Sequence, residues 1–152
     1  MTAPKLGGMV LHAADIEDLA SRIRESDRLD CAMHQCDAGL ALLDGLRKGP
    51  CWAVTWENQT IGALGWTYDG YIWSLWTDLT REQSLAIMAR TRHMVRALVK
   101  DAARPLGNTV REDNRLTIAW LRASKCFDFF GGAITHEGHR YLPFFAKPLG
   151  DL

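Results

Sequence analysis

The chain has 152 residues, 47% of them hydrophobic and 24% charged, and its 18 basic residues balance its 18 acidic ones. This length predicts a single domain over residues 1–152 that needs neither disulfides nor a structural metal to fold. Because these charges cancel, the molecule has no net electrostatic field that would attract it to nucleic acid or to an anionic membrane. We therefore expect no specific nucleic acid and no membrane among its partners.

No window of the sequence approaches the roughly 20 apolar residues of a transmembrane helix. The apolar run at residues 6–11 is too short for the core of a signal peptide. Cytoplasm is therefore the predicted location. The four cysteines include no CxxC pair and are expected to be reduced core residues.

The first third of the chain predicts a short strand followed by helical segments. The strand is expected at residues 9–12, and Gly49-Pro50 ends the last helical segment. Apolar residues recur at helical spacing in between. The helix starts are predicted at Asp15, at Ser26 or Asp27, and at Asp37.

Three strands follow in quick succession. They are expected at residues 51–56, 60–68 and 71–77, and the dipeptide Asp69-Gly70 forms the second turn. Short strands separated by polar turns are typical of an antiparallel meander.

The longest helix is predicted at residues 81–103, with Thr80 and Gln83 as a capping box and Pro105 just beyond its end. Its buried stripe is expected to consist of Leu85, Met88, Val95, Val99 and Ala102.

The last third predicts a strand at residues 106–110, a helix at 113–125 that starts with Asp113, and strands at 127–134 and 140–146. The helix between the fourth and fifth strands implies that these two strands are parallel. The predicted fold is α/β, with a central, mostly antiparallel twisted sheet of about seven strands and about four flanking helices.

Residues 110–127 (VREDNRLTIAWLRASKCF) resemble a stretch of GNAT N-acetyltransferases, with Asn114, Thr117 and Ile118 at the family's spacing. The chain as a whole resembles more closely the GNAT-like internal core proteins of short-tailed phages, also called internal virion protein A. Five groups of residues carry this resemblance: residues 24–31 (RESDRLDC), 51–54 with 62–65, 73–78 (WSLWTD), Asn114 with 118–122 (IAWLR), and Gly138 with Phe144-Phe145.

The resemblance implies a GNAT-type fold and a role in virion assembly as an internal virion (core) protein. The partners it implies are phage or host proteins, including further copies of the chain. It places the protein in the host cytoplasm and packaged in the virion. The alternative is an active acetyl-CoA-dependent N-acetyltransferase that modifies an amine on a host or phage protein or on a small molecule.

The sequence departs from the acetyltransferase pattern in three places. GNAT enzymes bind pyrophosphate on a glycine-rich loop at the start of the long helix, whereas residues 78–84 contain no glycine and include Asp78 and Glu82. Leu121 stands where many GNAT enzymes have the tyrosine that protonates the leaving thiolate. Lys125-Cys126 replaces the glycine expected before the next strand. We therefore expect a catalytically degenerate protein with no cofactor.

If acetyl-CoA does bind, the resemblance implies a specific set of contacts. No catalytic residue is assigned, and Tyr141 and His139 are the candidates. The residues expected to contact the cofactor are Leu75, Trp76, Thr77, Arg81, Gln83 and Asn114.

A metal site is not expected. Cys31, His34 and Cys36 lie close together in the sequence, but two further ligands at zinc-site spacing are missing. On a helix, Cys31 and Cys36 would also point to different sides of the axis.

Two side-chain patterns leave alternatives open. Arg92, Arg96 and Lys100 form a basic stripe that either contacts phosphates of DNA or coenzyme A or is a solvated helix face; we expect the latter. The chain's six tryptophans either stack on a ligand or pack in the core; we expect mostly the core.

Overall fold

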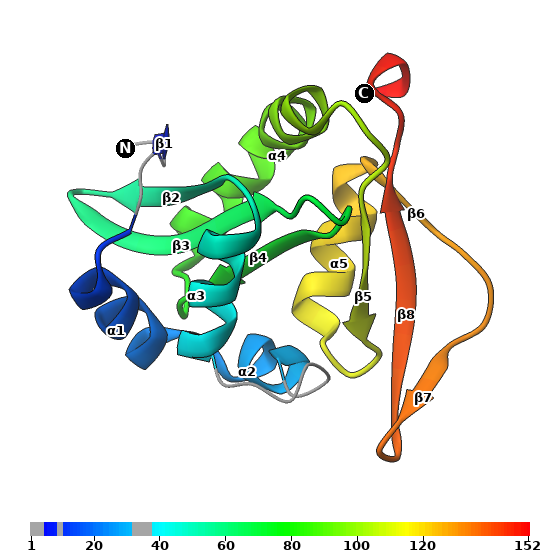
Figure 1. The fold of residues 1–152 in the computed structure, drawn as a ribbon, viewed down its shortest axis with the longest axis horizontal. Coiled ribbons are helices and arrows are strands. Elements are labelled where there is room, and N and C mark those ends of the chain that lie inside the picture. The colour runs from blue at the N-terminus through cyan, green and yellow to red at the C-terminus, as the bar shows by residue number, and fades with distance from the viewer. Residues whose placement is uncertain (1–4, 9–10, 32–37) are drawn as a thin grey trace.

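The computed structural model describes residues 5–8, 11–31 and 38–152, and within them it contains two four-stranded sheets (Figure 1). The first sheet has the order β1 (Lys5–Gly8), β2 (Cys51–Trp56), β3 (Gln59–Trp66) and β4 (Ile72–Trp76). In the second sheet, β8 (His139–Ala146) pairs with β5 (Gly107–Arg111) on one edge and with β6 (Phe127–Phe129) and β7 (Ile134–His136) on the other.

The helices form two layers around these sheets. Figure 1 shows α1 and α3 on one side of the first sheet, and α4 and α5 on the other side. One core cluster joins α4 and α5 to both sheets, and a second cluster joins α1 and α3 to the first sheet. The helices are α1 (Ala13–Arg22), α2 (Glu25–Cys31), α3 (Ala38–Lys48), α4 (Arg81–Ala102) and α5 (Arg115–Ser124).

The predicted parallel pair of the fourth and fifth strands is not confirmed. Every ladder between the described strands is antiparallel, and β4 and β5 meet at a single parallel bridge between Tyr71 and Gly107. Beyond that bridge the two strands diverge. The expected sheet of about seven strands is therefore split in two. The predicted strand at 127–134 is also divided into β6 and β7 around Gly131, which has a φ of +64°.

Helix boundaries with a local sequence signal were predicted well. Thr80 and Gln83 form the expected capping box of α4, with Gln83 N donating to Thr80 Oγ1 at 3.1 Å and Thr80 N donating to Gln83 Oε1 at 3.0 Å. α3 ends at Lys48, immediately before Gly49-Pro50.

Four other predicted boundaries need correction or are not tested. Asp15 is not the N-cap of α1; that residue is His12, whose N–H donates to Asp15 at 3.2 Å. The N-cap of α5 is Asn114 rather than Asp113. The first strand lies at 5–8 instead of 9–12, and residues 9–10 and the helix start at Asp37 fall outside the described residues.

The predicted buried stripe of α4 is wrong in its first half. Leu85 is 60% exposed, and the buried residues include Thr91. The Thr91 hydroxyl donates to Ile87 O at 2.9 Å and accepts from Trp120 Nε1 at 2.8 Å, so a polar side chain is satisfied within the core. A hydrophobic pattern cannot reveal such a position. The observed stripe is Ile87, Thr91, Met94, Val95, Leu98 and Ala102.

All six tryptophans are buried or half-buried, which agrees with the expected core packing. None of the helices in the described ranges combines the length and the apolar character needed to cross a membrane.

Candidate functional site

The divergence of β4 and β5 creates an opening between the two sheets. At its narrow end, Gly107 N donates to Gly70 O at 3.0 Å and Asn108 Nδ2 donates to Ile72 O at 2.7 Å. A cavity of about 750 Å³ passes through this opening, with lining residues from α2, α3, β3, β4, β5, α4 and α5. This volume lies in the range of small-molecule sites.

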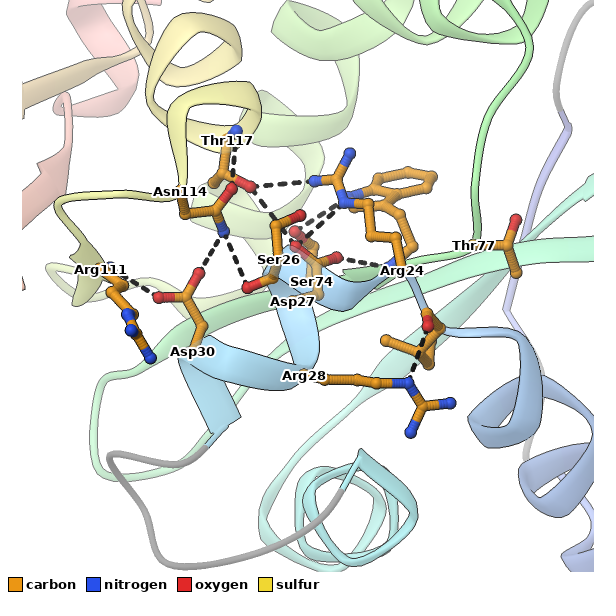
Figure 2. A network of polar contacts seen from close by, with 12 residues as sticks. Arg24, Ser26, Asp27, Arg28, Asp30, Ser74, Thr77, Arg111, Asn114 and Thr117 are labelled. Carbon is orange, nitrogen blue, oxygen red and sulfur yellow. Dashed lines mark hydrogen bonds and ion pairs between the residues drawn. The ribbon is translucent and has the colours of Figure 1, made fainter.

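Two carboxylates of α2 close the wide end of the opening (Figure 2). Asp27 Oδ2 accepts the backbone N–H of Trp76 in β4 at 2.8 Å. Asp30 Oδ1 accepts the backbone N–H of Arg111 in β5 at 2.6 Å. Because the two aspartates are three residues apart on one helix, they lie on the same side of it. One turn of α2 thus connects the strand edges that do not pair with each other.

The same carboxylates bind the start of α5. Arg24 Nε lies 3.0 Å from Asp27 Oδ1, and Arg24 Nη2 donates to Thr117 Oγ1 at 2.9 Å. Asn114 Nδ2 donates to Asp30, while Asn114 Oδ1 accepts from Thr117 N at 3.2 Å and caps the helix. Figure 2 shows these residues gathered around α2. We call Arg24, Asp27, Asp30, Asn114 and Thr117 the α2 network.

Burial governs the protonation of both carboxylates. It raises the pKa of Asp30 to about 6, although hydrogen bonds from Asn114 and from the Arg111 N–H act in the opposite direction. Burial also raises the pKa of Asp27, and the charge of Arg24 offsets part of this effect. Burial thus disfavours the charged form of both carboxylates, and the donors that bind them offset part of this cost.

We expect Asp30 to make the protein less stable as the pH rises from about 4 to about 6. The folded-state pKa lies above the ordinary aspartate value of 3.8, so the folded protein binds more protons than the unfolded chain in this window. The measurement is the free energy of urea unfolding at several pH values, for wild type and for Asp30→Asn. The wild type should lose stability relative to the variant as the pH rises to about 6. Parallel curves would contradict the assignment.

Of the six residues expected to contact a cofactor, only Leu75 lines the cavity. The Trp76 side chain is 2% exposed, donates from Nε1 to Ser74 Oγ at 3.1 Å, and packs edge-on against Trp120. The Thr77 hydroxyl donates to Ile61 O at 3.0 Å. Trp76 and Thr77 thus serve the packing and pairing of β4.

The remaining three predicted cofactor residues are also committed elsewhere or lie outside the opening. Gln83 belongs to the α4 capping box, and Arg81 is exposed at the helix start. Asn114 is 2% exposed and belongs to the α2 network. The structure therefore does not bring these six residues together around one cavity.

The two catalytic candidates lie near each other but away from the cavity. His139 Nδ1 is 3.0 Å from Arg111 Nη2, and Tyr141 is the cross-strand partner of Arg111. Burial raises the pKa of Tyr141, and its side chain is 2% exposed. Leu121, at the position of the family's tyrosine, is 1% exposed and packs in the core. Neither His139 nor Tyr141 is among the residues that line the cavity.

The described residues contain no group of three or more potential metal ligands. Cys31 is buried, whereas His34 and Cys36 fall outside the described residues. The cysteines described are Cys31, Cys51 and Cys126, and all three are buried.

The sequence analysis assigned no functional role to Arg24, Asp27 or Asp30, although residues 24–31 carried part of the phage resemblance. Asp27 was predicted only as a possible helix start, whereas α2 begins at Glu25. The available signal was the pair of aspartates three residues apart in a short helix with arginines at 24 and 28. That pattern is ambiguous without the strand edges that the carboxylates bind.

Comparison with solved structures supports the GNAT fold. The chain is similar to the ribosomal-protein-S18-alanine N-acetyltransferase of Escherichia coli (TM-score 0.62, 16% identity, 96% of this chain and 94% of that one). It is also similar to a GNAT-family acetyltransferase of Bacillus cereus (TM-score 0.64, 13% identity, 97% of this chain and 99% of that one). A third similar structure is a ribosomal L7/L12 α-N-protein acetyltransferase in complex with coenzyme A (TM-score 0.58, 14% identity, 97% of this chain and 95% of that one).

No protein-family model and no curated protein sequence matches the chain. The structural similarity extends over nearly the full length, so the fold is that of GNAT acetyltransferases.

Proposed function

We propose that this chain is a GNAT-fold protein that has lost acetyl-CoA chemistry and acts through protein–protein contacts in virion assembly. The observation that carries the proposal is the α2 network, whose buried carboxylates occupy the strand edges of the β4–β5 opening. An acetyltransferase of this fold needs that opening for the thioester arm of its cofactor.

Acyl transfer requires free N–H donors around the thioester carbonyl. In β4 the N–H of Trp76 is bound to Asp27, and in β5 the N–H of Arg111 is bound to Asp30. Both acceptors carry negative charge when ionised, and coenzyme A is itself a polyanion. The residues present at the opening therefore do not fit the cofactor.

The start of α4 is equally unsuited to a pyrophosphate. Anion sites at helix starts need free backbone N–H groups, but Gln83 N is bound to Thr80. Asp78 and Glu82 are exposed at the same place and would repel phosphate.

Protein contact is supported by an exposed apolar patch on the second sheet. Phe130 and Phe145 are 56% and 45% exposed, and their rings pack edge to face at 5.3 Å. Exposed aromatic residues of this kind are typical anchors of protein interfaces. The assembly role is supported further by the resemblance to phage internal core proteins. Residues 24–31, which carry part of that resemblance, contain α2 and three members of its network, Arg24, Asp27 and Asp30.

An active N-acetyltransferase is the competing function. Its support is the fold, the cavity of about 750 Å³, and Asp30, whose pKa of about 6 suits a general base and whose side chain lines that cavity.

A thiol-release assay separates the two functions. The purified chain is incubated with acetyl-CoA and a panel of primary amines, peptide N-termini and lysine peptides, with an active GNAT enzyme as positive control. We expect no thiol release above the uncatalysed rate. Turnover with any acceptor that is lost in Asp30→Asn would establish the enzyme instead.

The assembly role needs its own test. Purified particles from infected cells that express the chain are analysed by immunoblotting, for wild type and for a Phe130→Ser/Phe145→Ser variant that remains folded. Incorporation of the wild type and exclusion of the variant are expected. Absence of the wild-type chain from assembling particles would contradict the role.

A further inference from the structure

The exposed side of α4 carries a concentration of positive charge that the neutral composition of the chain conceals. Residues 81–104 contain six basic and two acidic residues, whereas the whole chain is formally neutral. The remainder of the molecule is therefore correspondingly acidic. The positive charge lies mainly in the C-terminal two-thirds of α4, away from the helix start where this fold holds a cofactor.

Three of these cations lie in one row along about two turns of the helix. Arg92, Arg96 and Lys100 follow each other at four-residue spacing, so they form one row with about 6 Å of rise between neighbours. Arg90 is also exposed, but it lies two residues before Arg92 and therefore points to a different side of the helix. We call Arg92, Arg96 and Lys100 the α4 basic face.

Acidic side chains do not neutralise this face. Every ion pair between described residues lies outside α4. Asp101 accepts from Trp66 Nε1 at 2.8 Å, and Glu82 lies two turns before Arg90. Arg96 donates to the backbone oxygen of Leu152. Arg92 and Lys100 have no acidic partner among the described residues. The three cations are exposed, as expected for a solvated helix face, and the acids that balance their charge lie elsewhere in the sequence.

The residues between the cations favour a particular kind of partner. Ala89, His93 and Ala97 are exposed among them, so small side chains let a partner approach the cations closely. This part of the helix has no tryptophan, tyrosine or phenylalanine. A protein interface typically needs such anchors, and single-stranded nucleic acid is typically held by stacking on them. A double helix can be bound through its regularly spaced phosphates without aromatic anchors.

We infer that the α4 basic face binds the phosphate backbone of double-stranded DNA without reading its base sequence. The face is about 12 Å long, which matches about three to four base pairs along a duplex. Phosphate contacts of this type position a protein but carry no sequence information.

The inference is tested by fluorescence anisotropy of a labelled 20-base-pair duplex titrated with the full chain between 50 and 200 mM KCl. Three phosphate contacts predict that log Kobs falls with log salt with a slope of about −3. The double variant Arg92→Gln/Lys100→Gln should weaken binding at least tenfold at 50 mM KCl and reduce the slope by about 2.

A matched control removes the same charge elsewhere. Arg115→Gln/Arg140→Gln changes two exposed cations on α5 and β8 and should leave the affinity within about twofold. An equal loss in this control would overturn the inference, as would no binding of the wild type at 50 mM KCl. Displacement of the duplex by poly-glutamate at equal charge would assign the face to an acidic protein and overturn it as well. Thermal melts confirm that each variant is folded.

Discussion

Replacing Asp27 with alanine is expected to lower the free energy of unfolding by about 3–5 kcal/mol, because it leaves the largely buried guanidinium of Arg24 without its carboxylate partner. Asp27 is 4% exposed, and it both pairs with Arg24 at 3.0 Å and accepts the Trp76 N–H at 2.8 Å. For a chain of this length the loss corresponds to a fall in melting temperature of roughly 6–20 °C. Urea and thermal unfolding followed by circular dichroism provide the measurement.

Asp18→Ala is the matched control for this experiment. Asp18 also pairs with an arginine, Arg22 at 2.7 Å, but its side chain is 68% exposed. An exposed pair of this kind contributes less than about 1 kcal/mol. If Asp27→Ala were as mild as Asp18→Ala, the α2 network would not be holding β4 to α2.

The second large effect is expected at Leu121, which occupies the position of the proton-donating tyrosine of many GNAT enzymes. Leu121→Ala should lower the free energy of unfolding by about 2–5 kcal/mol, since its side chain is 1% exposed and its removal leaves a cavity in the main core. The same unfolding measurement applies.

Leu85→Ala makes the same chemical change on the surface. Leu85 is 60% exposed on α4, so its truncation should change stability by less than about 0.5 kcal/mol. The hydrophobic pattern of the sequence placed Leu85 in the buried stripe and would predict a large loss. Similar losses for Leu85 and Leu121 would therefore support the sequence pattern over the structure.

Elements that depend on neighbouring residues were predictable from the sequence. The capping box of Thr80 and Gln83 and the stop at Gly49-Pro50 act within a few residues. The turn at Glu137-Gly138, where both residues have positive φ, is likewise encoded locally. These signals were enough to order the elements and to suggest the fold.

The candidate site was not predictable in the same way, because its contacts join distant segments. Asp27 binds an N–H that lies 49 residues away, and Asp30 binds one that lies 81 residues away. The divergence of β4 from β5 also has no local signature; a crossover helix suggested a parallel pair, and only one bridge forms. The missing glycines of residues 78–84 were visible in the sequence, whereas the binding of two carboxylates to the strand edges of the opening was not.

The central claim is that the α2 network occupies the strand-edge N–H groups that acetyl-CoA would need. Isothermal titration of the full chain with acetyl-CoA and with coenzyme A tests this claim most directly. Titrations at low salt and neutral pH should give no binding heat, and millimolar cofactor should not raise the melting temperature. Binding with a micromolar Kd would contradict the claim, because the cofactor would then have to displace Asp27 or Asp30 from the strand edges or bind without using them.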